Sequence, residues 1–232
     1  MSGEQPNTLA NVGLFRGLPD ATRQALEKRC RWRNFAAHEQ IIDRQSTSQD
    51  VYFIVHGRVR VVNYSMSGRE IAFDEIESGS YFGELAAIDG EPRSANIVAL
   101  ETTTVAMLSS EAFRAALEEN PELALQLMLR MSSIIRASTE RIMDLSTLGA
   151  NNRIYAELLR LAKSDIREDN TAVITPVPIH GDIASRVSTT RETVARVLSE
   201  LSRLELVKRE RNRLVILDLE HLTEMVEQFQ VE

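Results

Sequence analysis

The first half of the chain alternates short apolar runs with turn residues, from about Arg31 to Leu108. Residues 51–55 and 58–62 are rich in β-branched and aromatic side chains, and His56-Gly57 separates them, so we expect a β-hairpin here. Glycines stand at positions 57, 68, 79 and 90, a regular spacing typical of the turns in a sandwich or roll of short strands. Short helices are predicted on either side of this region, at 18–28 and 111–117.

A long helix is predicted to start at Asn120-Pro121, because proline favours the first helical turn. Its apolar stripe alternates spacings of four and three residues, a pattern typical of a coiled-coil seam. We therefore expect a homodimer through residues 121–148, the alternative being that the helix packs only on the strands. The stripe consists of Ala124, Met128, Met131, Ile135, Ser138, Ile142 and Leu145.

A second domain is predicted after the long helix. Gly149 and Asn151-Asn152 interrupt the helical pattern and indicate a domain hinge. An amphipathic helix is expected from Arg153 to Lys163, followed by a polar loop with a short strand at Val173-Ile174. The last predicted strands, 206–209 and 213–217, form a hairpin with Glu210-Arg211-Asn212 at its tip.

The segment between these strands predicts two helices, His180–Arg186 and Thr190–Leu204, joined by the tight turn Val187-Ser188-Thr189. Thr190 is expected to cap the second helix. In a helix-turn-helix the start of the second helix faces base edges, where arginine binds guanine and glutamate accepts from cytosine. An ordinary helical hairpin is the alternative. The residues expected to face bases are Arg191, Glu192 and Arg196.

Composition and charge narrow the class of protein. The 232 residues are 43% hydrophobic and 26% charged, as in a globular protein, and no stretch has the length of a membrane span. The start of the chain shows no basic-then-apolar signal, so a cytoplasmic protein is expected. The single cysteine, Cys30, excludes an intrachain disulfide and a cysteine-ligated cluster within one chain. The net charge of −7 disfavours nucleic acid, but residues 186–213 carry eight basic against four acidic side chains and predict a basic face.

The segment Gly83–Ser94 predicts a pocket for a small anion. It follows an apparent strand at Ser80-Tyr81-Phe82, and a glycine before a short helix lets backbone N–H groups point at a bound anion. Arg93 enters an apolar run, where a buried guanidinium needs a counter-charge such as phosphate. Glu84 would repel a phosphate unless it accepts a hydrogen from another part of the ligand, for which a ribose hydroxyl is suited. The alternative is an ion pair between Glu84 and Arg93 across the loop.

Two motifs carry a resemblance to known families. Phe82-Gly83-Glu84-Leu85-Ala86 followed by Pro92-Arg93-Ser94-Ala95 resembles the phosphate-binding cassette of cyclic-nucleotide-binding domains. The segment from Ile183-Ala184 through Arg191–Leu198 resembles the winged helix-turn-helix of CRP/FNR regulators, which reads a TGTGA-type half-site. One departure is Ser188, which stands where the turn commonly carries glycine.

The resemblance assigns roles to individual residues. It implies that Glu84 takes the ribose 2′-hydroxyl and that Arg93 and Ser94 take the cyclic phosphate. It also implies that Ser138 and Thr139 reach the base of the nucleotide, one from each subunit. The rest of the implied ligand site is Gly83, Leu85 and Ala86, and the implied DNA-facing set adds His180, Thr189, Thr190 and Lys208.

The resemblance covers residues 13 to about 220 and implies an α+β chain. The expected parts are an N-terminal double-stranded, jelly-roll-like β-roll with a helix (1–120), a dimerisation helix (121–148) and a winged helix-turn-helix domain (149–232). The implied function is a homodimeric transcription regulator, not an enzyme, that recognises a palindromic TGTGA-like site. It is expected to bind cAMP, with cGMP as the second candidate, and no metal. Its implied partners are double-stranded DNA and RNA polymerase, with no membrane. The alternatives are a redox or gas sensor on the same scaffold, and a nucleotide-binding adaptor whose C-terminal hairpin binds protein.

Overall fold

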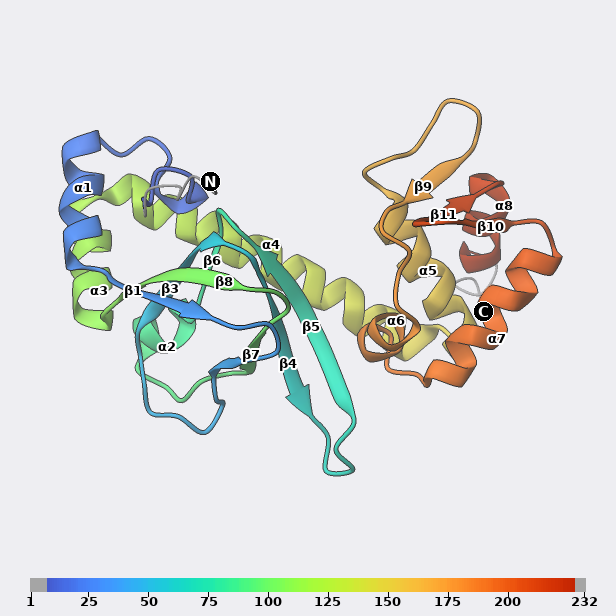
Figure 1. The fold of residues 1–232 in the computed structure, drawn as a ribbon, viewed down its shortest axis with the longest axis horizontal. Coiled ribbons are helices and arrows are strands. Elements are labelled where there is room, and N and C mark those ends of the chain that lie inside the picture. Colours follow the sequence, from blue (N-terminus) through green and yellow to red (C-terminus); the bar gives the residue numbers. More distant parts are fainter. Residues whose placement is uncertain (1–7, 228–232) are drawn as a thin grey trace. The chain divides into compact units, whose positions relative to one another are not determined.

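The computed structural model describes residues 8–227. The chain forms two compact units, Met1–Ile134 and Ile135–Glu232, and the boundary falls within α4 (Pro121–Thr147) (Figure 1). Each unit is therefore described by itself. The expected division at 120/121 and 148/149 stays a prediction, and the ends of its outer segments, 1–7 and 228–232, lie outside the described residues.

The strands described in the first unit pair in two antiparallel sheets, as the predicted roll requires. A shared apolar core lies between the sheets and draws Phe35, Tyr52, Ile54 and Phe82 from one, Ile42, Val59 and Ile97 from the other. The first sheet has the order β1 (Arg31–Phe35), β8 (Thr103–Leu108), β3 (Val51–His56), β6 (Tyr81–Phe82). The second has the order β2 (Gln40–Ile42), β7 (Asn96–Ala99), β4 (Arg58–Tyr64), β5 (Glu70–Glu77).

The predicted hairpin at 51–62 is wrong, although its two strands and its turn exist. β3 pairs with β6 and β8, whereas β4 pairs with β5 and β7. At the crossing between the sheets, Gly57 has φ of 90°, and a Cβ there would lie 2.7 Å from the Cα of Thr103. Only glycine fits such a position. The predicted turn at Gly68 does join paired strands, β4 and β5.

Helices cover the outer face of the first sheet. They are a short 3₁₀ turn (Gly13–Phe15), α1 (Asp20–Arg29), α3 (Ser110–Glu119) and the start of α4, while α2 (Glu84–Asp89) follows β6. The predicted helices at 18–28 and 111–117 are confirmed by α1 and α3. A second apolar cluster joins these helices to the sheet through Phe15, Leu26, Phe53, Tyr81, Phe113, Leu123 and Leu127.

The apolar stripe of α4 is exposed on the single chain. Met128, Ile135 and Ile142 are spaced seven residues apart and are 57%, 65% and 63% exposed. Leu123 and Leu127, on another face of the same helix, are buried against the first unit. Packing on the first unit therefore covers one face of α4 and part of Met131, and it leaves Met128, Ile135 and Ile142 of the predicted seam exposed. No helix within residues 8–227 is long and apolar enough to cross a membrane.

The second unit contains the predicted helix-turn-helix and wing. Its described elements are α5 (Ala150–Ala162), β9 (Ala172–Ile174), α6 (His180–Arg186), α7 (Arg191–Arg203), β10 (Val207–Glu210), β11 (Arg213–Ile216) and α8 (Leu219–Glu227). The three strands form one antiparallel sheet in the order β10-β11-β9. Residues of α5, α6, α7, β11 and α8 share one core that includes Ile154, Leu158, Ile183, Val197, Leu201, Ile216 and Leu222. The helix α8 was not predicted from the sequence, in which the last predicted element is the strand 213–217.

The predicted break at Asn151-Asn152 is wrong. α5 begins at Ala150, so both asparagines lie in its first turn, and Asn152 is buried. Gly149 occupies the N-cap position and directly follows the buried Leu148. The chain therefore re-enters a helix about three residues earlier than the sequence pattern indicates, because asparagine is compatible with a helix start.

Candidate nucleotide-binding and DNA-binding sites

The candidate nucleotide site is built around the corner between β6 and α2. Gly83 makes this corner with φ of 84°, in the left-handed region that favours glycine. A Cβ at Gly83 would lie 2.7 Å from Nη1 of Arg93 and 3.0 Å from the carbonyl oxygen of Asp50. The glycine therefore serves both the turn and the close approach of Arg93 to the end of the strand.

Arg93 is a buried cation that forms no ion pair with a carboxylate within residues 8–227. Its side chain is only 4% exposed, and it donates to the Gly83 carbonyl at 2.8 Å, the Asp50 carbonyl at 2.8 Å and Ser48 Oγ at 3.2 Å. Its Nε is buried and has no hydrogen-bond partner among the described residues. Burial lowers the pKa of the guanidinium, while Tyr52, Asp50 and Glu84 act in the opposite direction. Within residues 8–227 it forms no ion pair with Glu84, so the alternative of a simple ion pair across the loop fails. A buried charge held only by neutral acceptors is suited to an anion.

Glu84 lies at the same corner, between two arginines. It is 6% exposed, and burial raises the pKa of its carboxyl, while its own backbone N–H, Arg130 and Arg93 act in the opposite direction.

The two residues of β6 belong to different cores: Phe82 stacks on Tyr52 at 5.0 Å inside the roll, while Tyr81 lies under Arg130 of α4. The guanidinium of Arg93 lies 5.8 Å from the Tyr52 ring, on the inner side.

The other predicted ligand residues differ in their exposure and in the unit to which they belong. Ala86 is buried, whereas Leu85 is 42% exposed. Ser94 is exposed, and its carbonyl accepts from Asn63 Nδ2 at 3.2 Å. Ser138 and Thr139 are exposed on the part of α4 that belongs to the second unit, and Thr139 donates to the Ile135 carbonyl of its own helix.

Sequence reasoning missed four residues of this corner. Ser48, Asp50 and Tyr52 surround Arg93, and the first two act through a hydroxyl and a backbone carbonyl that any residue could supply in the right place. Arg130 had a detectable signal, since it is a basic residue within the mostly apolar first half of α4.

The candidate DNA site is the start of α7. Thr190 caps the helix as predicted, accepting from the backbone N–H of Thr193 at 3.2 Å. Arg191, Glu192 and Arg196 are exposed, whereas Val194, Val197 and Leu201 on the opposite face are buried. The three predicted base-reading side chains therefore share the solvent face of one helical end.

The remaining predicted DNA residues surround this end. Arg191 extends over Gly181 in α6, where a Cβ would lie 2.9 Å from Nε of the arginine. His180 begins α6 and is half-buried, and Thr189 is buried with its N–H donating to the Ala184 carbonyl at 3.0 Å. Thr189 thus fixes the turn, while Lys208 is exposed on the wing strand β10.

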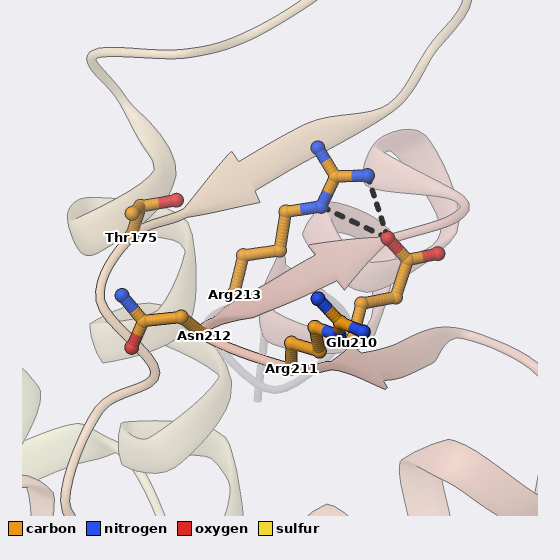
Figure 2. Close-up of a pocket in the computed structure, with 5 residues that line it drawn as sticks. All are labelled: Thr175, Glu210, Arg211, Asn212 and Arg213. Atoms are coloured by element: carbon orange, nitrogen blue, oxygen red, sulfur yellow. Dashed lines mark hydrogen bonds and ion pairs between the residues drawn. The ribbon is translucent and has the colours of Figure 1, made fainter.

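The wing tip carries an internal carboxylate (Figure 2). Glu210 pairs with Arg213 at 2.6 Å and with Lys208 at 3.3 Å, and these hydrogen bonds lower the pKa of its carboxyl. Arg211 and Asn212 form the tip, which borders an open hollow of about 380 Å³ together with Thr175. Two basic residues of the wing are thus already paired, which leaves Arg211 as the exposed cation nearest the tip.

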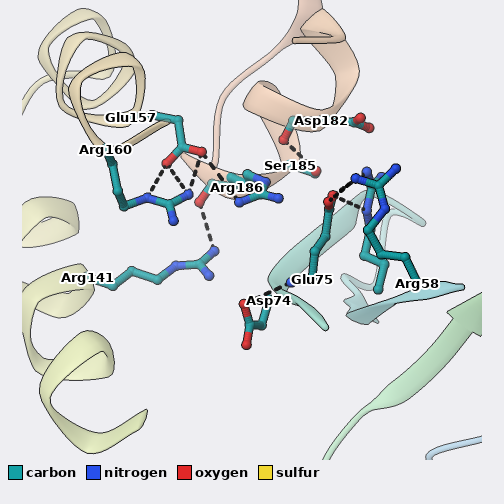
Figure 3. Close-up of polar contacts among 10 residues, drawn as sticks. Arg58, Asp74, Glu75, Arg141, Glu157, Arg160, Asp182, Ser185 and Arg186 are labelled. Carbon is teal, nitrogen blue, oxygen red and sulfur yellow. Dashed lines mark hydrogen bonds and ion pairs between the residues drawn. The ribbon is translucent and has the colours of Figure 1, made fainter. Parts of the chain in front are cut away.

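Ion pairs fasten the helix-turn-helix to its neighbours in the second unit (Figure 3). Glu157 of α5 is 7% exposed and pairs with Arg160 at 2.6 Å and Arg186 of α6 at 3.7 Å. Arg141 of α4 donates to the Arg186 carbonyl at 2.8 Å. Arg153 donates to the carbonyls of Leu148 and Val187 at 2.7 Å and 2.9 Å. The turn before α7 is therefore held by side chains from both α4 and α5.

Ser188 gives this turn a measurable strain. Its φ is 55°, so the departure from the usual glycine leaves a β-carbon in the left-handed region. Ser188→Gly should raise the free energy of unfolding by about 0.5–1 kcal/mol, because relief of this strain exceeds the added freedom of the unfolded chain. Urea unfolding measures the change, with Ser188→Ala as the control that keeps the strain. A Gly variant no more stable than the Ala variant would contradict this reading of the turn.

The fold and the two candidate sites together define a class of protein. It has a β-roll with a buried arginine and glutamate at the β6–α2 corner, followed in the chain by a winged helix-turn-helix. Residues 32–120 match the family model of the cyclic nucleotide-binding domain, and residues 152–225 match that of the Crp-like helix-turn-helix domain. The chain belongs to the CRP/FNR family of transcription regulators, which is a family of regulators and not of enzymes.

Similar proteins agree with this assignment. A curated relative, the "CRP-like cAMP-activated global transcriptional regulator" of Mycobacterium tuberculosis, is 24% identical over 215 residues, which is 92% of this chain and 96% of the relative. A solved structure of a CooA mutant from Carboxydothermus hydrogenoformans has a TM-score of 0.77 at 21% identity and covers 87% of this chain and 90% of that one. The structure of CLP, a "c-di-GMP responsive global regulator" of Xanthomonas campestris, has a TM-score of 0.73 at 18% identity, covering 85% and 99%. These two structures establish the fold.

Proposed function

We propose that this chain is a cyclic-nucleotide-dependent, homodimeric transcription regulator of the cytoplasm, with cAMP as its preferred effector. The observation that carries the proposal is Arg93, a buried guanidinium beside the buried carboxylate of Glu84. Within residues 8–227 its Nε has no hydrogen-bond partner and it forms no ion pair. A cyclic phosphate supplies the missing counter-charge, and a ribose hydroxyl supplies the hydrogen that Glu84 accepts. The name of the mycobacterial relative, "cAMP-activated", favours cAMP.

The identity of the base is the finer part of the proposal. Ser138 and Thr139 are assigned to the base across the dimer, and hydroxyls both donate and accept, so they serve either purine. cGMP is the second candidate, because the exposed hydroxyl of Ser94 beside Arg93 is suited to a guanine-selective pocket. The responsiveness of CLP to c-di-GMP shows that this fold is compatible with another guanine nucleotide.

A redox or gas sensor is the rival on the same scaffold. Cys30 is half-buried, and burial raises the pKa of its thiol to about 12. Its thiolate is therefore scarce at neutral pH, which makes it a poor redox sensor. Within residues 8–227 no group of three or more His, Cys, Asp and Glu side chains is placed to hold a metal ion.

We assign dimerisation to α4 and sequence reading to α7. The exposed heptad positions of α4 supply the self-complementary surface, and two copies of α7 would then read two TGTGA-like half-sites about one helical turn, ~34 Å, apart. Nucleotide binding shifts the dimer between DNA-incompetent and DNA-competent states. RNA polymerase is the protein partner that this proposal includes.

Arg191→Ala should weaken binding to the selected operator by about 1–3 kcal/mol and relax base preference at one position of each half-site, because a bidentate contact to guanine is lost. Fluorescence anisotropy with labelled operator, with and without cAMP, measures both effects. Arg203→Ala is the matched control, since Arg203 is exposed in the last turn of the same helix. Unchanged operator affinity in Arg191→Ala would show that α7 is not the reading helix, and operator binding that is equal with and without either nucleotide would remove the proposed regulation.

A further inference from the structure

Arg130 reaches the nucleotide corner from α4. Its Nη1 donates to Ser80 Oγ, and its guanidinium carbon lies 4.2 Å from the centre of the Tyr81 ring. Tyr81 is 3% exposed, and its hydroxyl is buried without a hydrogen-bond partner. A single side chain of the predicted dimer helix thus contacts both the residue before β6, Ser80, and the first residue of β6, Tyr81.

The contact is close to Glu84 in both sequence and space. β6 is fixed on its other side by pairing with β3, so Arg130 and β3 together set where Gly83 and Glu84 begin α2. The charged groups that act on Glu84 are Arg130 from α4 and Arg93 from the loop before β7, with the phenol of Tyr81 from β6. Arg114 of α3 is used elsewhere, donating to the Ala87 carbonyl at 3.0 Å.

Arg130 is also accessible from solvent. It lines an open hollow of about 370 Å³ between β5 and α4, together with Asp74, Glu77, Ser133 and Ile134. The guanidinium of Arg130 thus contacts Ser80 and Tyr81 at the β6 corner and also borders this hollow.

We propose that Arg130 is a positioning residue of the nucleotide site, fixing the β6–α2 corner so that Glu84 meets the ribose as a charged carboxylate. This inference rests on the proposed nucleotide-binding function. It adds a residue of α4 that acts within its own subunit and lies on the core-facing side of the helix, away from the predicted seam.

The pH dependence of binding follows from this arrangement. Protonated Glu84 cannot accept from the ribose hydroxyl as a carboxylate does, so nucleotide affinity should fall as the pH drops through the pKa of the folded carboxyl. Burial has already raised that pKa, and Arg130 opposes the increase. Loss of the positive charge at position 130 should raise it further, so the fall in affinity should begin at higher pH.

The test is calorimetric titration of the full-length protein with cAMP and with cGMP, from mildly acidic to neutral pH. Arg130→Gln should bind the preferred nucleotide about 10-fold more weakly at neutral pH, as expected for a lost charged contact, and the difference should grow as the pH falls. Arg130→Lys should restore most of the wild-type pH profile, because it keeps the charge. Arg136→Gln is the matched control: Arg136 is exposed on the same helix.

The outcomes separate the inference from the function on which it rests. If the wild type binds and Arg130→Gln has the same pH profile, with only its melting temperature lowered, Arg130 is structural and the inference is overturned. If Arg130→Gln does not fold, the comparison of Arg130→Lys with the wild type decides. A folded Lys variant keeps the positive charge and should keep the wild-type pH profile of nucleotide binding. A Lys variant whose affinity falls at clearly higher pH than that of the wild type would overturn the inference. If the wild type binds neither nucleotide, the proposed function itself fails.

Discussion

Arg93→Gln should weaken cyclic-nucleotide binding about 100-fold or more. Two charge-assisted hydrogen bonds to the phosphate would be lost, each worth about 1.5–3 kcal/mol, and a neutral amide cannot balance the phosphate charge. Glutamine is a better choice than alanine, because Arg93 also holds the carbonyls of Gly83 and Asp50 and its complete truncation would loosen the loop. Competition against a fluorescent nucleotide analogue measures the affinity.

The matched control is Arg114→Gln. Like Arg93, Arg114 is an arginine that donates to a backbone carbonyl, but it is half-buried and its acceptor is Ala87 of α2, at 3.0 Å. The Arg114 variant should therefore keep nucleotide affinity within a few-fold of the wild type. Equal losses in the two variants would mean that Arg93 supports the loop and does not bind phosphate.

Ile142→Glu should separate the dimer and reduce operator affinity by about 100-fold or more. Ile142 is 63% exposed on the single chain and occupies a repeating seam position with Met128 and Ile135. Each subunit would bury a carboxylate against its twin, and the loss of the second half-site removes the gain of bivalent binding, about 10²–10⁴-fold. Sedimentation velocity measures the oligomeric state, and anisotropy with operator DNA measures the affinity.

Met143→Glu tests whether the seam is specific. Met143 is 56% exposed and adjacent to Ile142, but it lies on the next face of the helix, outside the heptad stripe. We expect this variant to remain dimeric. A wild-type protein that sediments as a monomer at micromolar concentration, or a Met143 variant that dissociates as readily as the Ile142 variant, would contradict the assigned interface.

Much of the fold could be predicted from local patterns. Gly57, Gly68, Gly79 and Gly90 all have positive φ, between 75° and 90°, so their regular spacing did mark turns. His180–Arg186 was placed at the observed bounds of α6, and Thr190 was correctly assigned as the cap of α7. These features depend on residues close in sequence, where propensity and periodicity carry the information.

The errors concern contacts between distant segments. Nothing in residues 51–62 says that β3 and β4 pair with different strands, because both a hairpin and a crossing between sheets need a turn at Gly57. The asparagines at 151 and 152 are compatible with a break or a helix start, and the burial of Asn152 in the assembled core decides between them.

The same distinction applies to the candidate sites. Glu84 and Arg93 are predicted from local spacing together with the resemblance of their segment to a phosphate-binding cassette. Arg191, Glu192 and Arg196 are predicted from helical periodicity, which places them on one exposed face, together with the resemblance to a winged helix-turn-helix. Arg130 lies 46 residues along the chain from Glu84 in the sequence, and only the packing of α4 on β6 brings it to the corner.

The most direct test of the account is calorimetric titration of the wild-type protein with cAMP and, separately, with cGMP. We expect saturable binding of at least one of them, with one nucleotide per chain, because each β-roll has its own buried guanidinium that can bind a phosphate. Heats of dilution alone for both nucleotides, with the protein folded and at high concentration, would contradict it.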